Sequence, residues 1–87
     1  MKLVVLYHPD SEMGTPVESF VEEIKSATDK EIGLFSLETK EGSEFAKLYD
    51  VTQYPAILVA RDDGQINKSW EGNSLPTKDD VVGYLNA

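Results

Sequence analysis

Cysteine is absent from this chain of 87 residues. Its absence excludes disulfide bonds, thiolate metal sites and every reaction that needs a thiol nucleophile, and it leaves the redox compartment undetermined. Histidine is scarce as well, because His8 is the single imidazole, and a histidine-rich metal site is therefore impossible. The acidic pairs Asp10 with Glu12 and Asp62 with Asp63 lack the spacing that would supply the ~6–8 oxygen ligands of Ca²⁺. We therefore expect no metal site and no cofactor.

Basic residues are also few, with 8 Lys and Arg against 16 Asp and Glu, for a net charge of −8. Nucleic acids and anionic membranes bind basic patches, so we expect neither as a partner. The apolar run near the N-terminus, Leu3 to Tyr7, is too short for a signal-peptide core or a membrane span. With Met1 present, we expect a cytoplasmic protein, and we expect it to be a monomer.

The segment Asp50 to Val59 organises the rest of the chain. Pro55 cannot donate a hydrogen bond to a sheet, so it is expected at the first position of a strand, followed by the buried residues 56–59. A strand that is apolar at every position is covered on both faces, which indicates helices above and below the sheet. A chain of this length forms one domain, residues 1–87, because domains typically have ~50–250 residues.

Three further strands are predicted, at Leu3–Tyr7, at Ile32–Leu37 and, half exposed and alternating, at Ile66–Trp70. The Arg61-Asp62-Asp63-Gly64 turn predicts an antiparallel hairpin before the last strand. The residues Gly72, Asn73 and Ser74 are expected to end that strand.

Three helices are predicted between and after these strands. Thr15-Pro16-Val17-Glu18 has the pattern of a capping box, and the helix that follows should run to about Ala27 with the buried stripe Val17, Phe20, Val21 and Ile24. A short helix should run from about Glu41 or Ser43 to Tyr49, with Phe45, Leu48 and Tyr49 facing inward. Thr77 should cap a last helix whose apolar side is Val81, Val82, Tyr84 and Leu85. The predicted fold is α/β, in the order β-α-β-α-β-β-α, with a four-stranded mixed sheet flanked by three helices.

This order, with a proline opening the third strand, resembles the minimal, glutaredoxin-sized thioredoxin fold over nearly the whole chain. The most specific match is Tyr49 to Val59, which is similar to the family segment that contains a cis-proline. The resemblance implies a cis bond before Pro55 and a loop there that presents its backbone to peptides.

The resemblance fails at the residues that would carry redox chemistry. The two cysteines of the family's active-site motif align with Ser11 and Gly14, and the aspartate often buried beneath that motif aligns with Val5. Without a thiolate there is no disulfide exchange, so we expect a thioredoxin-like domain that is not an enzyme and has no catalytic residues.

The candidate site is a groove for a protein or peptide partner at the proline loop. It would be formed by His8, Ser11, Met13, Gly14, Tyr54, Pro55 and Gly72. The simpler interpretation is that Pro55 only fixes the turn.

The same loop contains residues that suggest two other functions. Ser11 at a helix N-terminus would bind glutathione or another small thiol ligand, as resemblance to glutathione transferases suggests. His8, Asp10 and Ser11 contain the residue types of a hydrolase triad, but residues so close in one loop rarely converge in the needed geometry.

Trp70, on the last predicted strand, is interpreted as a core residue, with an interface anchor as the alternative.

Overall fold

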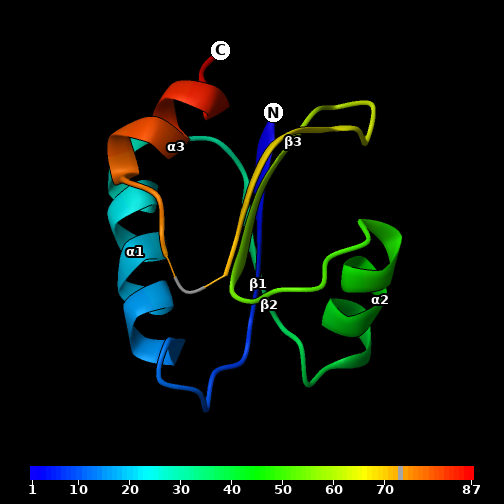
Figure 1. Cartoon of the computed structure of the whole chain (residues 1–87). Coiled ribbons are helices and arrows are strands. Elements are labelled where there is room, and N and C mark those ends of the chain that lie inside the picture. Colours follow the sequence, from blue (N-terminus) through cyan, green and yellow to red (C-terminus); the bar gives the residue numbers. More distant parts are fainter. Residues whose placement is uncertain (73) are drawn as a thin grey trace.

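The computed structural model describes residues 1–72 and 74–87, so Asn73, one of the residues expected to end the last strand, lies outside the described residues. The strands are β1 (Lys2–Tyr7), β2 (Ile32–Ser36), β3 (Ala56–Ala60) and β4 (Ile66–Glu71), and the helices are α1 (Gly14–Ala27), α2 (Lys40–Leu48) and α3 (Lys78–Leu85). α1 and α3 cover one face of the sheet and α2 covers the other (Figure 1). The predicted element order and architecture are confirmed. None of the described helices has the length and apolar character needed to cross a membrane.

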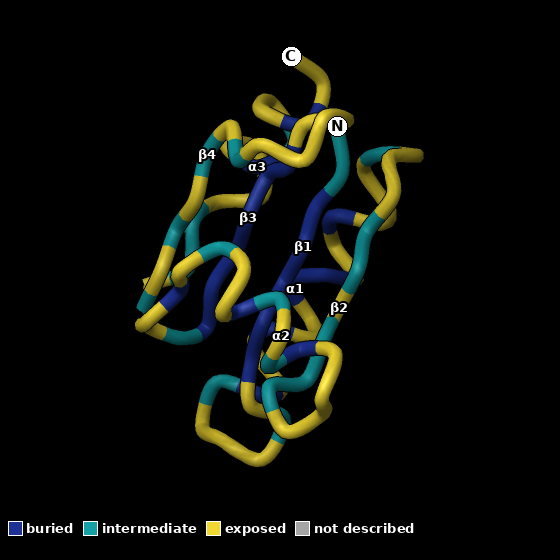
Figure 2. Tube along the Cα trace, turned by 90° about the vertical axis from the view of Figure 1, so that its right-hand side faces the viewer, coloured by how far each residue is buried: buried dark blue, intermediate teal, exposed yellow. Residues whose placement is uncertain are grey.

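The four strands lie in the order β2-β1-β3-β4. β1 runs parallel to β2 and antiparallel to β3, and β3 runs antiparallel to β4, as the hairpin signal predicted. All five residues of β3 are buried, and the two central strands form the buried axis of the molecule (Figure 2). The continuous apolar run after Pro55 is therefore a central strand covered on both faces.

Successive side chains of the central strands point to opposite faces and build two cores. The larger core lies under α1 and α3 and contains Leu3, Val5, Tyr7, Val17, Phe20, Val21, Ile24, Ile57, Val59, Val81 and Leu85. The smaller core lies under α2 and contains Val4, Leu6, Ala46, Val51, Ala56 and Leu58. The predicted apolar stripe of the first helix is thus confirmed as buried.

The prediction that Thr15 caps α1 is wrong. The N-cap residue is Met13, which makes no side-chain capping hydrogen bond, and the helix already includes Gly14 and Thr15. The amide of Val17 donates to the Met13 carbonyl at 2.9 Å, so the first intrahelical bond forms before Thr15. The predicted reciprocal partner, Glu18, instead accepts a hydrogen bond from the Tyr7 hydroxyl at 2.7 Å.

α2 begins earlier than predicted. Thr39 is its N-cap and accepts from the Gly42 amide at 3.1 Å, and the helix ends at Leu48. Leu48 does not face inward, because its exposed fraction is 71%. Ala46 takes the buried position, since it lies one turn after Gly42 on the side that contacts the sheet.

A register shift between Val59 and Ala60 divides β4 between the two faces. Trp70 pairs with Ile57 and packs against the larger core, as expected of a core residue, whereas Ile66 pairs with Ala60 and packs against the smaller core. Strict alternation along the strand predicts Ile66 and Trp70 on the same face of the sheet. The bulge places them on opposite faces because it inserts one extra residue into the strand.

Candidate functional site

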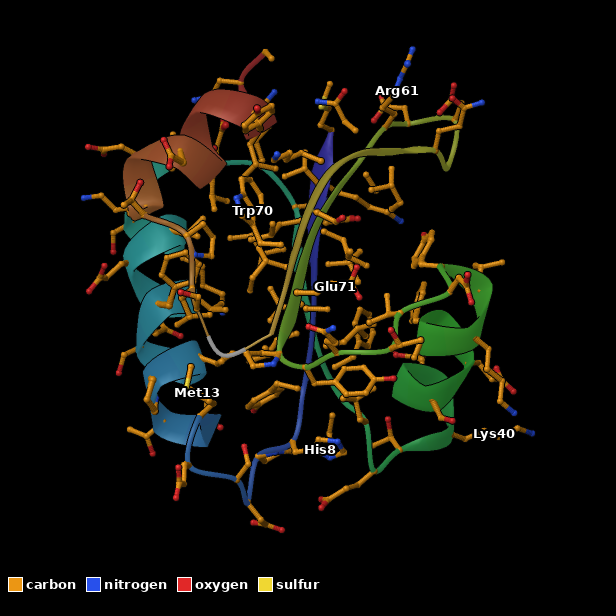
Figure 3. All side chains as sticks on the ribbon, viewed as in Figure 1. His8, Met13, Lys40, Arg61, Trp70 and Glu71 are labelled. Atoms are coloured by element: carbon orange, nitrogen blue, oxygen red, sulfur yellow. The ribbon has the colours of Figure 1, made fainter. Side chains whose placement is uncertain are left out.

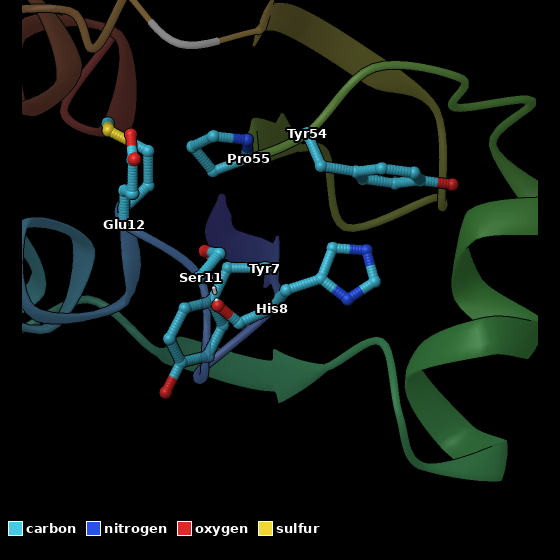
Figure 4. Close-up of a pocket in the computed structure, with 7 residues that line it drawn as sticks. Tyr7, His8, Ser11, Glu12, Tyr54 and Pro55 are labelled. Carbon is cyan, nitrogen blue, oxygen red and sulfur yellow. Dashed lines mark hydrogen bonds between the residues drawn. The ribbon is translucent and has the colours of Figure 1, made fainter.

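A hollow of about 470 Å³ lies where β1 ends and β3 begins (Figure 4). We call it the Pro55 hollow. Its lining residues come from the end of β1, the loop after it and the two residues before β3: Tyr7, His8, Ser11, Glu12, Met13, Tyr54 and Pro55. The wall is therefore made of segments far apart in the sequence that the β1–β3 pairing brings together.

The segment before β3 is held at several points. The last pair of the β1–β3 ladder is Leu6 with Ala56, so Tyr54 lies beyond its end. The peptide bond between Tyr54 and Pro55 is cis. The Tyr54 hydroxyl donates to the Val51 carbonyl at 3.0 Å, and the Pro55 carbonyl accepts from the Gly72 amide at 3.0 Å.

The loop between β1 and α1 is held by hydrogen bonds to its own backbone. The Ser11 hydroxyl donates to the His8 carbonyl at 2.6 Å, and the Ser11 amide donates to the same oxygen at 3.1 Å. The Gly14 amide in turn donates to the Ser11 carbonyl at 3.0 Å. Both the hydroxyl of Ser11 and the first amide of α1 are therefore engaged within the protein.

His8 contacts Tyr54 through the edge of its ring. The ring centroids are 5.6 Å apart and the planes meet at 85°, a common geometry for aromatic pairs. Because the Ser11 hydroxyl donates to the backbone of His8 and not to its imidazole, the nucleophile–base hydrogen bond of a hydrolase triad is not formed.

The phenol of Tyr7, at the end of β1, has a perturbed pKa. Burial, followed by the hydrogen bond to Glu18 and the charge of its carboxylate, raises the pKa of Tyr7 to about 12. A phenol with this pKa stays protonated at neutral pH, so it is a hydrogen-bond donor and not a base.

Gly14 is buried against the loop that precedes it. A Cβ at this position would overlap the carbonyl oxygen of Pro9, a backbone atom that cannot rotate away. No residue with a side chain, cysteine included, fits at Gly14 without movement of the Pro9 backbone. The position that the resemblance aligns with the second cysteine of the redox motif therefore has no room for a side chain in this chain.

The predicted site residues are only partly brought together. His8, Ser11, Met13, Tyr54 and Pro55 line the hollow. Gly14 is buried against the loop, and Gly72 donates its amide to the Pro55 carbonyl but is not among the lining residues. Sequence reasoning missed Tyr7 and Glu12. Tyr7 could have been found as the last residue of a strand, a position where α/β folds place their sites. Glu12 was considered only as one of an acidic pair with Asp10, and nothing in the sequence placed it in the groove.

Within residues 1–72 and 74–87, no group of three or more His, Cys, Asp or Glu could hold a metal ion.

Comparisons with known proteins identify the fold. No family model matches the chain, and no curated protein sequence matches it. Among solved structures, thioredoxin 1 from Thermosipho africanus TCF52B is similar with a TM-score of 0.73 and 12% identity, over 99% of this chain and 91% of that chain. A structure described as that of a malarial protein is similar with a TM-score of 0.72 and 10% identity, over 98% of this chain and 92% of that chain.

Proposed function

We propose that this chain, a thioredoxin-like fold without cysteine, binds an extended segment of another protein at the Pro55 hollow and carries out no thiol chemistry. The observation that carries the proposal is the hollow itself, bordered by the backbone of Tyr54 beyond the end of the β1–β3 ladder. No cysteine is present to attack a disulfide, so the proposal assigns binding and not disulfide exchange to this surface.

The hollow has the size and lining for peptide side chains. Its volume of about 470 Å³ is within the ~300–1,000 Å³ range of pockets that bind small organic groups. Apolar contact comes from the Met13 side chain, the Pro55 ring and the faces of Tyr7 and Tyr54. One or two apolar side chains of a partner would therefore be removed from water here.

The backbone of Tyr54 supports an extended occupant. Neither its N–H nor its C=O takes part in the hydrogen bonds found in the part of the chain that the structure describes. An extended peptide lying beside this segment would pair with these groups, as in other complexes where a strand is added to a sheet edge. Main-chain bonds would then supply affinity, and the hollow would select side chains.

Glutathione binding, the alternative from the sequence, has no specific structural support. The Ser11 hydroxyl already donates to the His8 carbonyl, the Gly14 amide donates to the Ser11 carbonyl, and Pro16 has no amide hydrogen. Few donors therefore remain at the N-terminus of α1 for a thiolate or carboxylate. We expect no change in melting temperature at millimolar glutathione, and a saturable increase would favour this alternative.

The proposal is tested with a displayed library of random seven-residue peptides selected on the immobilised protein. Dissociation constants are then measured by fluorescence anisotropy for the wild type, Tyr54→Ala and the matched control Tyr49→Ala. Both variants remove a half-buried tyrosine ring, but only Tyr54 lines the Pro55 hollow. We expect micromolar binding that Tyr54→Ala weakens about tenfold and Tyr49→Ala leaves within about twofold. Failure to select any saturable binder, or equal losses in both variants, would contradict the proposal.

A further inference from the structure

A second hollow, of about 350 Å³, lies on the α2 side of the proline loop. We call it the α2 hollow. Its apolar lining comes from Leu37, Ala46 and Val51, and Ser43, Lys47 and Asp50 supply its polar groups. It adjoins the Pro55 hollow, and six of its eight lining residues are not shared with that hollow.

His8 and Tyr54 line both hollows, so their ring contact forms the ridge between them. In Figure 4 both rings lie on the side toward α2, whereas Ser11 and Glu12 lie on the side toward α1. The Tyr54 hydroxyl is fixed by its bond to the Val51 carbonyl, whereas His8 is exposed, and no hydrogen bond found among the described residues uses its ring nitrogens. The ridge therefore has one fixed ring and one ring free to adjust to an occupant.

The geometry of an extended chain fits two neighbouring hollows. Residues i and i+2 of a strand point to the same side and are separated by ~6.6–6.8 Å. The two hollows share His8 and Tyr54 and therefore adjoin each other, and side chains at i and i+2 are the nearest pair that an extended chain presents on one side. A peptide crossing the His8–Tyr54 ridge would thus place alternate side chains in the two hollows.

Charge indicates which peptides would be favoured. The loops at this end of the sheet and the α2 hollow carry the exposed carboxylates of Asp10, Glu12, Glu38 and Asp50. The nearby ammonium groups are those of Lys40 and Lys47, and no ion pair found among the described residues joins Lys47 to Asp50. Together with the net charge of −8, this excess of carboxylates attracts a cationic partner.

We propose that the two hollows form one track for a basic, extended peptide, with apolar side chains at i and i+2 seated on either side of the His8–Tyr54 ridge. This inference rests on the proposed function and adds to it the second hollow, the spacing and the charge of the partner.

The test uses three labelled peptides, KKLSLSK, EELSLSE and KKLSASK, in fluorescence anisotropy with the whole protein. We expect KKLSLSK to bind about tenfold tighter than KKLSASK, because alanine in place of the second leucine leaves the second hollow largely unfilled. We expect EELSLSE to bind at least about threefold weaker than KKLSLSK at low salt, with a smaller difference at high salt.

Two matched pairs of variants show which residues of the protein cause these two differences in peptide affinity. Ser43→Phe fills the α2 hollow, and Ser26→Phe makes the same change at an exposed position in the last turn of α1. Only Ser43→Phe should remove the preference for KKLSLSK over KKLSASK. Glu12→Gln should reduce the preference for the lysine peptide, whereas Glu23→Gln, on the exposed side of α1, should not.

The outcomes separate this inference from the proposed function. If library peptides bind in a Tyr54-dependent manner but KKLSLSK shows no advantage over KKLSASK and EELSLSE, the two-hollow track is wrong and the Pro55 hollow alone binds. If no peptide of either set binds a protein that melts cooperatively, both proposals are wrong. The comparison of KKLSLSK with KKLSASK needs no variant, so it decides whether a second apolar side chain contributes to binding even if Ser43→Phe fails to fold.

Discussion

Gly14 brings the start of α1 against the carbonyl of Pro9, and this contact leaves no room for a Cβ. Gly14→Ala should lower the free energy of unfolding by about 1–3 kcal/mol, the usual cost of overpacking. The matched control is Gly83→Ala in α3, where an added Cβ meets nothing within 4 Å and helix propensity should raise stability by about 0.5–1 kcal/mol. Urea unfolding of both variants checks the pair, and a stabilised Gly14→Ala would show that the loop packs differently.

Tyr7 makes stability depend on pH in the alkaline range. Its pKa is raised from 10.0 to about 12 in the folded protein, first by burial and then by Glu18. The unfolded chain loses this proton first, so the stabilisation is present below pH 10 and is lost as pH rises toward 12.

Two variants test the origin of this shift in the ultraviolet phenolate titration. Tyr7→Phe should remove the transition near pH 12, and Glu18→Gln should lower the pKa of Tyr7 while leaving it above 10.0, because burial remains. An unshifted transition in Glu18→Gln would contradict the role of the carboxylate.

Individual site residues were predictable only where the residue type itself indicated a structural or chemical role. The proline at the start of a strand and the aromatic residue before it marked the loop, and the absence of cysteine ruled out redox chemistry there. The sequence contains no such signal for Glu12, because its position in the hollow depends on the loop conformation that the hydrogen bonds of Ser11 and Gly14 stabilise. Gly72 was expected in the groove; it holds the Pro55 carbonyl through its backbone amide but does not line the hollow.

At the scale of elements, the helix caps provide the clearest test of the local structure. Thr77 caps α3 by accepting from the Asp80 amide at 3.2 Å, whereas Thr15 lies inside α1 and caps nothing. Thr77→Ala should lower the free energy of unfolding by about 1 kcal/mol, and Thr15→Ala should change it by less than about 0.5 kcal/mol. Thermal unfolding measures both, and a larger loss for Thr15→Ala would restore the capping box predicted from the sequence.

Helices and strands were predictable from the sequence, but their ends and faces depended on tertiary contacts. The stripe of Val17, Phe20, Val21 and Ile24 identified α1 because a 3.6-residue period requires one buried side. The start of α1 was missed because the contact of Gly14 with Pro9 lets the helix begin early. The faces of β4 were missed because a bulge has no reliable sequence signal at Asn67.

At the scale of the whole molecule, the topology was predictable because few arrangements are compatible with this order of helices and strands. One parallel crossover and one tight hairpin, with an apolar strand covered on both sides, leave few topologies. The partner was not predictable, since a fold hosts many functions and the two hollows arise from residues spread over the chain.

The absence of thiols leads to a prediction for the whole protein. It should not accelerate the reduction of insulin disulfides by dithiothreitol above the uncatalysed rate, whereas a thioredoxin in the same assay should. Saturable acceleration by this cysteine-free protein would contradict the account of its chemistry.

The central claim is that a peptide lies along the Tyr54–Pro55 segment, and a two-dimensional ¹H–¹⁵N NMR titration tests it most directly. A selected peptide added to labelled protein should produce its largest amide shifts at His8, Ser11, Met13 and Tyr54, which line the Pro55 hollow. Two of these residues, His8 and Met13, are labelled in Figure 3. The exposed helix positions Ser26 and Gly83 serve as internal references and should not shift. Shifts centred on the outer strands β2 or β4, with the loop residues unchanged, would contradict the claim.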